Sequence, residues 1–453
     1  MLIYLLLLLI ITITLISYIL VKRDIFAPPV VFSGTFVVSI IIAIPNMSLW
    51  AFDMGNRTFT VLLIGIMSVC VGFFIIYFFK IKTTYKLKTT FLNVNSILYV
   101  KNYKLIVFFL FQILTLFLFY REFSIIATNM GAGDSLAEKI FLFRMNTAND
   151  NIEGNISTLV SNFMFVNTVS VYFFSYCFWY EYFSKNIVKI KYLLLFIVPI
   201  VISLLQGGRG GFVNLLLGFI IIMYILWLIN NNWKKMISIK QFSVILSMLI
   251  LFLILFSSVG LLILGRDNQL EQSSSMLSNI FRQISIYIAA PLKLLDMYMY
   301  TDYGIEDTIW GLSTFRSVYK FFGKIFNNNN WIVPPGFGEE MRIDNGQSFG
   351  NVYTMFRPYV QDFDYVGLII LSIFIGVIVG YVYFLIKYKQ NNNIININIV
   401  IYSILLSCLI QGFFSDVFYR TIFSTYFLKF VLYFKIIEWI FLSKKINKDY
   451  FRD

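Results

Sequence analysis

The chain has 453 residues, of which 59% are hydrophobic and 13% charged, and its mean hydropathy is +0.79. A soluble protein of this length needs far more polar surface, so the composition predicts a single integral membrane domain over residues 1–453. The formal net charge is +13, and the absence of histidine excludes histidine-based catalytic triads and histidine metal sites.

Apolar segments of the length that crosses a bilayer as a helix, roughly 17–25 residues, recur along the chain. The first begins at the second residue, and its basic residues, Lys22 and Arg23, follow it. A cleaved signal peptide has the opposite order, so we expect a membrane helix there. The fold class is therefore an all-α polytopic membrane protein with about eleven transmembrane helices. The predicted spans are 2–20, 28–45, 59–79, 103–120, 157–180, 192–205, 212–229, 241–264, 365–386, 397–414 and 421–442.

Basic residues give these helices an orientation. With the N-terminus outside and the C-terminus in the cytoplasm, the cytoplasmic segments and their edges hold 18 of the 24 lysines, which obeys the positive-inside rule. The arginines are distributed the other way, since ten of the twelve are external. That rule does not distinguish lysine from arginine, whereas the planar guanidinium suits phosphate and carboxylate. The pattern favours anion recognition outside the membrane, and ion pairing with the many external acidic residues is the alternative.

A glycine-flanked arginine separates the sixth and seventh predicted spans. Residues 206–211 read Gln-Gly-Gly-Arg-Gly-Gly, with Arg209 between the glycines. Glycine lets the backbone leave the helical conformation and come close to a ligand. The preceding span has 14 residues, or about 21 Å of helix, against a hydrocarbon core of about 30 Å. We therefore expect Arg209 to lie in a recess below the outer surface, and a plain tight turn between antiparallel helices is the alternative.

The largest external loop, 265–364, joins the eighth and ninth predicted spans. Its segment 280–295 is apolar but contains Pro291 and two basic residues. We expect this segment to be a helix on the membrane or a re-entrant segment rather than a full span. Each arginine of the loop alone has the pattern of a surface charge, but as a group they would clamp a diphosphate. With Arg209, the candidate diphosphate ligands are Arg266, Arg282, Arg316 and Arg357.

The end of this loop mixes amides, hydroxyls and carboxylates with tyrosine and phenylalanine. Sugars present hydrogen-bonding groups and flat apolar faces together, so the mixture predicts a glycan-binding surface; an ordinary polar loop is the alternative. The candidate glycan contacts are Gln347, Asn351 and Tyr359. Asp362 and Asp364 form an Asp-x-Asp pair, which holds a metal in many sugar transferases. Here the pair lies at the outer end of a span, and we infer no metal from it.

These features together resemble the Wzy-type oligosaccharide repeat-unit polymerases of bacterial O-antigen and capsule synthesis. The resemblance covers nearly the whole chain. It starts with Arg-Asp and Pro-Pro pairs in residues 23–29, and continues with the Gly-x-Arg-Gly break at 207–210 and the large external loop. The loop ends in a pattern made of Asn351, Thr354, Pro358-Tyr359, Asp362-Phe363 and Gly367.

The resemblance implies a helical, GT-C-like membrane glycosyltransferase in the bacterial cytoplasmic membrane. Such an enzyme transfers the glycan from undecaprenyl diphosphate to a sugar hydroxyl of another lipid-linked unit, at the external face. Its partners are then the undecaprenyl-diphosphate-linked oligosaccharide and membrane lipids, with a chain-length regulator and a flippase as further candidates. No nucleotide motif is present, and no nucleic acid is expected.

The implied mechanism uses neither a metal nor another cofactor. Arginines, with Arg209 and Arg266 first among them, would stabilise the leaving diphosphate. An external carboxylate would deprotonate the acceptor hydroxyl. Asp362 is the first candidate for this base, and the others are Asp364, Glu339, Glu340 and Asp267.

Three other functions are alternatives for a chain of this composition. A non-enzymatic assembly or chain-length partner is expected to carry a soluble domain or a coiled coil, which the sequence lacks. A flippase or another transporter is expected to carry charges within several spans and to lack so large an external loop. An O-antigen ligase is expected to carry a histidine in its external loop, which this chain lacks. The charge pattern therefore favours an enzyme that works at the external face.

Overall fold

The computed structural model describes residues 1–82, 100–148, 156–207, 209–233, 276–301, 309–332, 342–344, 347–388 and 395–442. The predicted span 241–264 and the candidates Arg266, Asp267, Glu339 and Glu340 lie outside these residues. Each of the other predicted spans is helical over most of its length, which confirms the all-α class.

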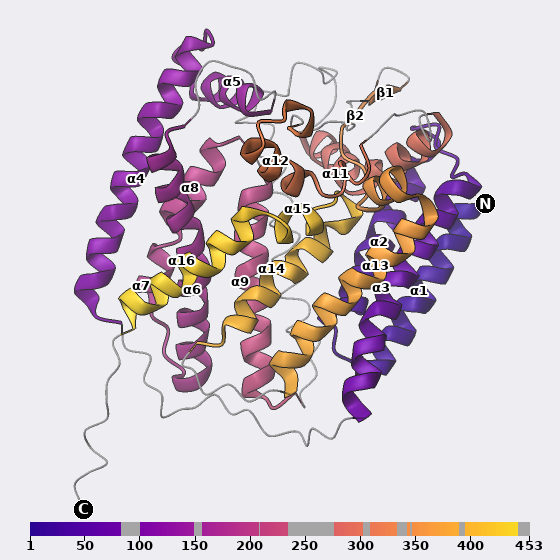
Figure 1. The fold of residues 1–453 in the computed structure, drawn as a ribbon, viewed down its shortest axis with the longest axis horizontal. Coiled ribbons are helices and arrows are strands. Elements are labelled where there is room, and N and C mark those ends of the chain that lie inside the picture. Colours follow the sequence, from indigo (N-terminus) through magenta and orange to yellow (C-terminus); the bar gives the residue numbers. More distant parts are fainter. Residues whose placement is uncertain are drawn as a thin grey trace, which may run out of the picture.

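Helices make up most of the described chain up to residue 233 (Figure 1). Its elements are α1 (Leu2–Leu20), α2 (Pro28–Ala43), η1 (Ile44–Asn46), α3 (Asn56–Lys82), α4 (Asn102–Asn129), α5 (Leu136–Ala148), α6 (Thr158–Lys185), α7 (Ile190–Leu194), α8 (Ile197–Leu205) and α9 (Arg209–Asn230).

The described residues after 275 add further helices and one small antiparallel hairpin, in which Asp344 pairs with Gln347. Their elements are α11 (Met276–Thr301), α12 (Arg316–Ile325), η3 (Asn329–Trp331), β1 (Arg342–Asp344), β2 (Gln347–Gly350), α13 (Phe356–Tyr388), α14 (Ile397–Ile410), η4 (Gln411–Phe413), α15 (Phe418–Ile422) and α16 (Thr425–Phe441).

Seven of the described helices are long and apolar enough to cross a membrane. They are α1, α2 with η1, α3, α4, α6, α9 and α13. Two shorter apolar segments, Ile190–Leu205 and Ile397–Phe413, accompany them. The elements that come from predicted external loops, namely α5, α12 and the hairpin, all lie at one end of these helices (Figure 1).

Glycine allows α3 and α13 to pack backbone against backbone. A Cβ on Gly376 would lie 2.1 Å from the Val69 carbonyl oxygen, and one on Gly72 would lie 2.1 Å from that of Ile373. Real Cβ atoms do not approach another atom so closely, so these two positions admit no larger residue without a shift of the helices. Small residues at such interfaces let membrane helices gain packing energy that lipid cannot supply.

The predicted span 192–205 is helical but interrupted, because α7 and α8 are separate helices on either side of Leu195 and Phe196. Pro199 has no N–H, so it cannot donate to the Leu195 carbonyl four residues earlier. Nε2 of Gln112, on α4, donates to that carbonyl instead, at 3.0 Å. A buried side chain of a neighbouring helix therefore supplies the hydrogen bond that this carbonyl would otherwise lack.

The predicted span 421–442 is also interrupted, close to its start. The α15 helix ends at Ile422, and α16 begins again at Thr425. Ser424 is the N-cap of α16, and its Oγ accepts the Phe427 N–H at 3.4 Å. Serine is a preferred N-cap, so this residue marks a new helix start within the apolar run.

Segment 280–295 is part of α11, which continues through Pro291 over 26 residues. Residues 289–295 are buried, and α11 packs against α2, α3 and β2. Ser39 Oγ of α2 donates to the Ile288 carbonyl at 2.6 Å. The helix is not among those apolar enough to cross the membrane, as expected for a segment other than a full span.

Lys293 fastens the hairpin to α11. Only 3% of the lysine is exposed, and its ammonium forms an ion pair with Asp344 at 2.5 Å and donates to the Trp50 carbonyl. It also lies 4.4 Å from the centre of the Phe349 ring. The hairpin therefore has a fixed place at the same end of the bundle as α5 and α12.

Candidate functional site

The first two turns of α13 lie at the end of the bundle that carries α12 and the hairpin (Figure 1). They run from Phe356 to a kink at Asp364, whose φ of +56° and ψ of −161° lie in a region that glycine normally occupies. An aspartate held there costs about 1–3 kcal/mol, and such backbone strain clusters at functional sites. Asp364 is exposed, and its Oδ1 accepts the Tyr365 N–H at 2.8 Å.

Arg357 points from these turns towards α11 and the segment between the hairpin and α13. Its guanidinium carbon lies 4.5 Å from the centre of the Tyr298 ring and 4.1 Å from that of Tyr353. Only 3% of Arg357 is exposed. The Tyr353 hydroxyl accepts a hydrogen bond from Nε of Arg342 at 3.3 Å. Two aromatic faces therefore stabilise the buried charge of Arg357.

Tyr359 points towards α15. Its hydroxyl donates to Asp416 Oδ1 at 2.8 Å, and the same oxygen accepts the Tyr419 N–H at 3.3 Å. Tyr359 is fully buried and Asp416 is 2% exposed. Tyr359 therefore orients a buried carboxylate in this structure and presents no surface to a glycan.

Asp362 points towards the start of α12. Its two carboxylate oxygens accept the backbone N–H groups of Ser313 at 3.3 Å and Thr314 at 2.6 Å. Thr314 Oγ1 donates in turn to the Pro358 carbonyl at 3.1 Å. Asp362 thus ties the loop that leads into α12 to the first turns of α13.

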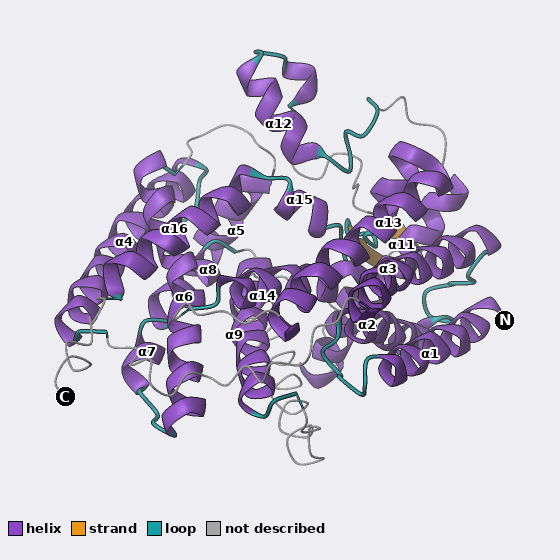
Figure 2. Ribbon diagram, turned by 60° about the horizontal axis from the view of Figure 1, so that its bottom comes forward, coloured by secondary structure: helices purple, strands orange, loops and turns teal. Residues whose placement is uncertain are grey.

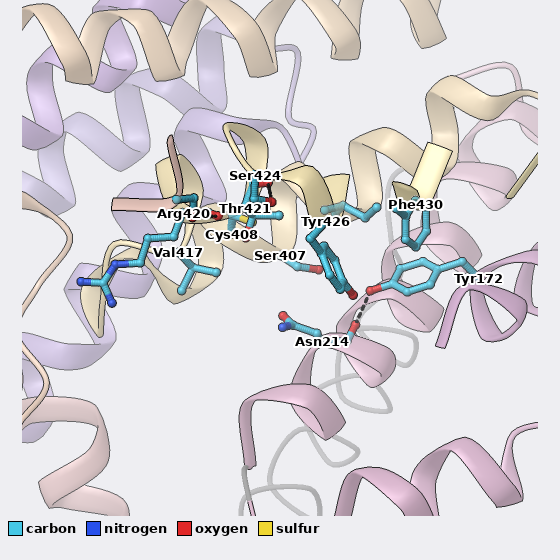
Figure 3. Close-up of a pocket in the computed structure, with 12 residues that line it drawn as sticks. Tyr172, Asn214, Ser407, Cys408, Val417, Arg420, Thr421, Ser424, Tyr426 and Phe430 are labelled. Atoms are coloured by element: carbon cyan, nitrogen blue, oxygen red, sulfur yellow. Dashed lines mark hydrogen bonds between the residues drawn. The ribbon is translucent and has the colours of Figure 1, made fainter. Parts of the chain in front are cut away.

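A cavity of about 390 Å³ lies between α6, α9, α14 and the segment from α15 to α16 (Figure 3). Arg420 is at one end of it, and Tyr172 and Phe430 are at the other. Hydroxyl, amide and thiol groups fill much of the wall between them. The lining residues are Tyr172, Asn214, Ser317, Ile404, Ser407, Cys408, Val417, Arg420, Thr421, Ser424, Tyr426 and Phe430.

Hydrogen bonds fix the wall of this cavity. The Tyr172 hydroxyl donates to the Asn214 carbonyl at 3.1 Å, and Gln411 Nε2 donates to Asn214 Oδ1 at 2.6 Å. At the other end, Ser317 Oγ donates to the Arg420 carbonyl at 3.0 Å. The cavity thus has a polar wall held by α6, α9 and η4, with α12 and α15 joined at its cationic end.

Arg209 is the first residue of α9, five residues before Asn214 on the cavity wall. The preceding break packs against α5, since a Cβ on Gly207 (φ +67°) would lie 3.1 Å from Arg144 Cβ. A Cβ on Gly210 would meet nothing within 4 Å. Glycine at 207 therefore serves helix packing, whereas the space beside Gly210 is open.

The other predicted diphosphate ligands fall into two groups among the described residues. Arg316, which is 9% exposed, begins α12 next to Ser317 on the cavity wall, and Arg282 lies half-buried on α11. Arg357 lies against α11 and the segment between the hairpin and α13 instead. The structure therefore places Arg316 and Arg420 near one cavity and Arg357 elsewhere.

The predicted glycan contacts are also divided. Asn351 is exposed after the hairpin, Gln347 begins β2, and Tyr359 is buried. Sequence reasoning missed Asp416 and counted Arg420 only as one more external arginine. Their signal was present, because an aspartate and an arginine four residues apart lie in the short segment between two predicted spans.

Metal-binding side chains do not gather in the described residues, where no group of three or more histidine, cysteine, aspartate or glutamate residues could hold an ion. The Asp362–Asp364 pair is divided by the kink of α13, with one carboxylate on backbone amides and the other exposed. The residues at this site thus offer arginine and hydroxyl groups as their main polar chemistry.

Comparison with known proteins gives one family. The family model described as O-antigen polysaccharide polymerase Wzy matches residues 1–355, which is 355 of the 453 residues. The match includes Arg209, Arg282 and Arg316 and ends immediately before α13. No curated protein and no solved structure matches the chain.

Proposed function

The chain belongs to the O-antigen polysaccharide polymerase Wzy family, and we propose a site and a mechanism for its reaction. As a family member it is a multi-pass membrane glycosyltransferase that polymerises lipid-linked repeat units. In the proposed reaction, the bond between the anomeric carbon of the growing glycan and its undecaprenyl diphosphate breaks. A sugar hydroxyl of a second lipid-linked unit forms the new bond, and undecaprenyl diphosphate leaves.

The proposed diphosphate site is the cationic end of the cavity. Its volume of about 390 Å³ is within the usual range for small-ligand pockets, about 300–1,000 Å³. Arg420 would bind the phosphates there with Arg316, and Arg209 and Arg266 would approach from the start of α9 and the external loop. A lipid diphosphate is already a weak base, so it needs charge stabilisation more than protonation. Preorganised guanidinium groups supply that stabilisation without a metal.

The proposed base is one of the two carboxylates of α13. Asp364 is exposed at a strained kink, whereas Asp362 has both oxygens on backbone amides. We assign the proton of the acceptor hydroxyl to Asp364 and a positioning role to Asp362. Asn351 and Gln347 would bind the acceptor glycan, and Tyr359 acts through Asp416.

The proposed architecture keeps eleven membrane spans in one GT-C-like domain. This count takes 241–264 as a span and the two broken segments as one crossing each. The large loop 265–364, with α11, α12 and the hairpin, then faces outside the bacterial cytoplasmic membrane. The N-terminus is outside and the C-terminus is in the cytoplasm. A chain-length regulator and a flippase are its proposed protein partners.

The observation that carries the assignment is the cavity with Arg420 at one end, since it combines a cation with glycan-compatible hydroxyls and aromatic rings. The test is polysaccharide length in a deletion strain that expresses Arg420→Ala, Arg420→Lys, Arg209→Ala or a matched control. Arg121→Ala is the control, because Arg121 is an exposed external arginine on α4. We expect single-unit glycan in the cavity variants and long chains in the control.

Two results would reject parts of this proposal. Long chains in both Arg420 variants, at equal protein levels, would remove the cavity from the diphosphate site. Loss of all surface glycan, including single units, would indicate a flippase, which acts before polymerisation. Full activity in Arg420→Lys with none in Arg420→Ala would show that a point charge suffices.

A further inference from the structure

The α12 helix separates its apolar and basic residues more sharply than a buried helix requires. Val318, Phe321, Phe322 and Ile325 follow the i, i+3, i+4, i+7 spacing of one helical face. Such a face normally packs into the protein core. Here Phe321 is 44% exposed, Phe322 is 42% exposed and Ile325 is 56% exposed. The described residues therefore leave the apolar face of α12 uncovered.

The opposite arc of α12 is basic. Arg316, Lys320 and Lys324 are spaced four residues apart and form one row on this arc. Exposed aromatic residues flank the helix. Phe326, which follows α12, is 65% exposed, and Trp310, which precedes it, is 73% exposed. Aromatic residues of this kind are enriched where protein crosses the boundary between lipid tails and water.

The position of α12 adds to this pattern. Ser317 and Thr314 bind it to α15 and α13, at the external end of the bundle. Figure 2 shows α12 projecting away from the other helices beside α13 and α15. Its 10 residues reach only about 15 Å, which is too short to cross a bilayer of about 30 Å. The helix therefore has the place and length of an element that lies along a membrane surface.

We propose that α12 lies in the external membrane interface, with Phe321, Phe322 and Ile325 among the lipid tails and Lys320 and Lys324 at anionic headgroups. A basic row opposite an uninterrupted apolar face is the arrangement of helices that bind anionic membranes. The positive charge of the lysines is complementary to the negative charge of phosphate-bearing lipids. This complementarity favours a lipid surface over a protein partner. This inference goes beyond the transfer reaction, because it concerns a lipid surface outside the cavity.

This contact would also set the height of the site. Arg316 begins α12, and Ser317 lies on the cavity wall and binds the Arg420 backbone. A helix held at the headgroup layer therefore keeps the cationic end of the cavity level with lipid phosphates. The apolar face and the basic row of α12 bind the surrounding lipids, and the cavity remains the site for the substrate.

The test is the depth of a nitroxide label in the full-length protein, reconstituted in phosphatidylcholine vesicles with or without phosphatidylglycerol. Labels are placed at Phe322→Cys and Ile325→Cys, and Lys324→Cys on the basic row is the matched control. The native cysteines Cys70, Cys177 and Cys408 are buried, and the chain without an added cysteine gives the background. Collision with oxygen reports lipid exposure, and collision with a water-soluble nickel complex reports water exposure.

We expect a higher ratio of oxygen to nickel collisions at positions 322 and 325 than at 324, and a decrease of that difference without phosphatidylglycerol. Equal nickel access at all three positions would overturn the proposal and favour a protein partner for this face. Deep labels that are indifferent to phosphatidylglycerol would overturn the role of the lysines. The readout needs no polymerase activity, so it remains interpretable if the proposed diphosphate site is wrong.

Discussion

Replacement of Tyr359 with phenylalanine should weaken the contact between α13 and the start of α15 through the loss of one hydrogen bond. The Tyr359 hydroxyl donates to Asp416 Oδ1 at 2.8 Å, where Tyr359 is fully buried and Asp416 is 2% exposed. A hydrogen bond to a charged group contributes about 1.5–3 kcal/mol, and its loss leaves a buried acceptor with one donor fewer. Tyr359→Phe should therefore destabilise the fold by about 1.5–3 kcal/mol.

A double-mutant cycle isolates this bond from the change in packing. In an Asp416→Asn background the acceptor is neutral, and the same hydroxyl should contribute only about 0.5–1.5 kcal/mol. The cost of Tyr359→Phe should therefore fall by roughly 1 kcal/mol when Asp416 is already asparagine. Because the two residues join α13 to α15, we expect shorter polysaccharide chains from Tyr359→Phe as well.

The assay is unfolding of the purified protein in detergent, followed by tryptophan fluorescence, with polysaccharide length measured in cells. Tyr381→Phe is the matched control, because Tyr381 is on α13 too but is 46% exposed. Equal stability of Tyr359→Phe and Tyr381→Phe would refute the reasoning. So would strict additivity of the Tyr359 and Asp416 substitutions, since it would mean that the hydroxyl does not act on the carboxylate.

Three further predictions concern the rest of the fold. Burial raises the pKa of the Asp296 carboxyl, and the Gly55 N–H, 2.9 Å away, partly offsets that rise. The Asp296 carboxyl therefore contributes stability that is present below the unfolded pKa of about 3.9. That contribution is lost as pH rises through the folded pKa. Asp296→Asn, which keeps an acceptor for Gly55, should therefore give a smaller fall in melting temperature between about pH 4 and about pH 7 than the native chain; an unchanged pH profile would contradict this. Gly376→Ala should prevent stable accumulation in the membrane, because its Cβ would lie 2.1 Å from a carbonyl oxygen, whereas Gly34→Ala, with nothing within 4 Å, should accumulate normally on an immunoblot. Arg357→Lys should lower the melting temperature by weakening contacts with two tyrosine rings at 4.1 Å and 4.5 Å, each worth about 2 kcal/mol when desolvated, and native stability would show that a point charge is enough.

Composition and periodicity were sufficient for helices whose ends coincide with changes in polarity. The first span is an example, since α1 covers the predicted residues Leu2–Leu20. The apolar pattern did not show where a span is interrupted. At the break between α7 and α8, the Leu195 carbonyl that Pro199 cannot serve accepts a hydrogen bond from Gln112 Nε2, and that partner lies on another helix. No hydropathy pattern contains that information.

The site was less predictable than the spans, because the type of a residue does not determine which other residues it contacts in the fold. Arg357 and Tyr359 have the chemistry of phosphate and glycan ligands, yet one is enclosed by two aromatic rings and the other binds Asp416. Asp416 and Arg420 lie in a short connection between two predicted spans, whereas most of the predicted site residues lie in the largest loop. Arg420 lines a cavity that depends on the packing of α6, α9 and α14, and Asp416 accepts the hydrogen bond of Tyr359.

The first turns of α13 organise this site because three of their side chains contact three different parts of the structure. Arg357, Tyr359 and Asp362 point to three different partners, which are α11 with the segment after the hairpin, α15, and the loop before α12. Beyond the kink at Asp364, the same helix packs tightly on α3 through Gly376. The membrane part of α13 therefore holds three parts of this end of the bundle, of which α12 and α15 also contact each other. Because α12 and α15 meet at the cationic end of the cavity, a change at any of these three side chains should alter polymerisation without touching the substrate.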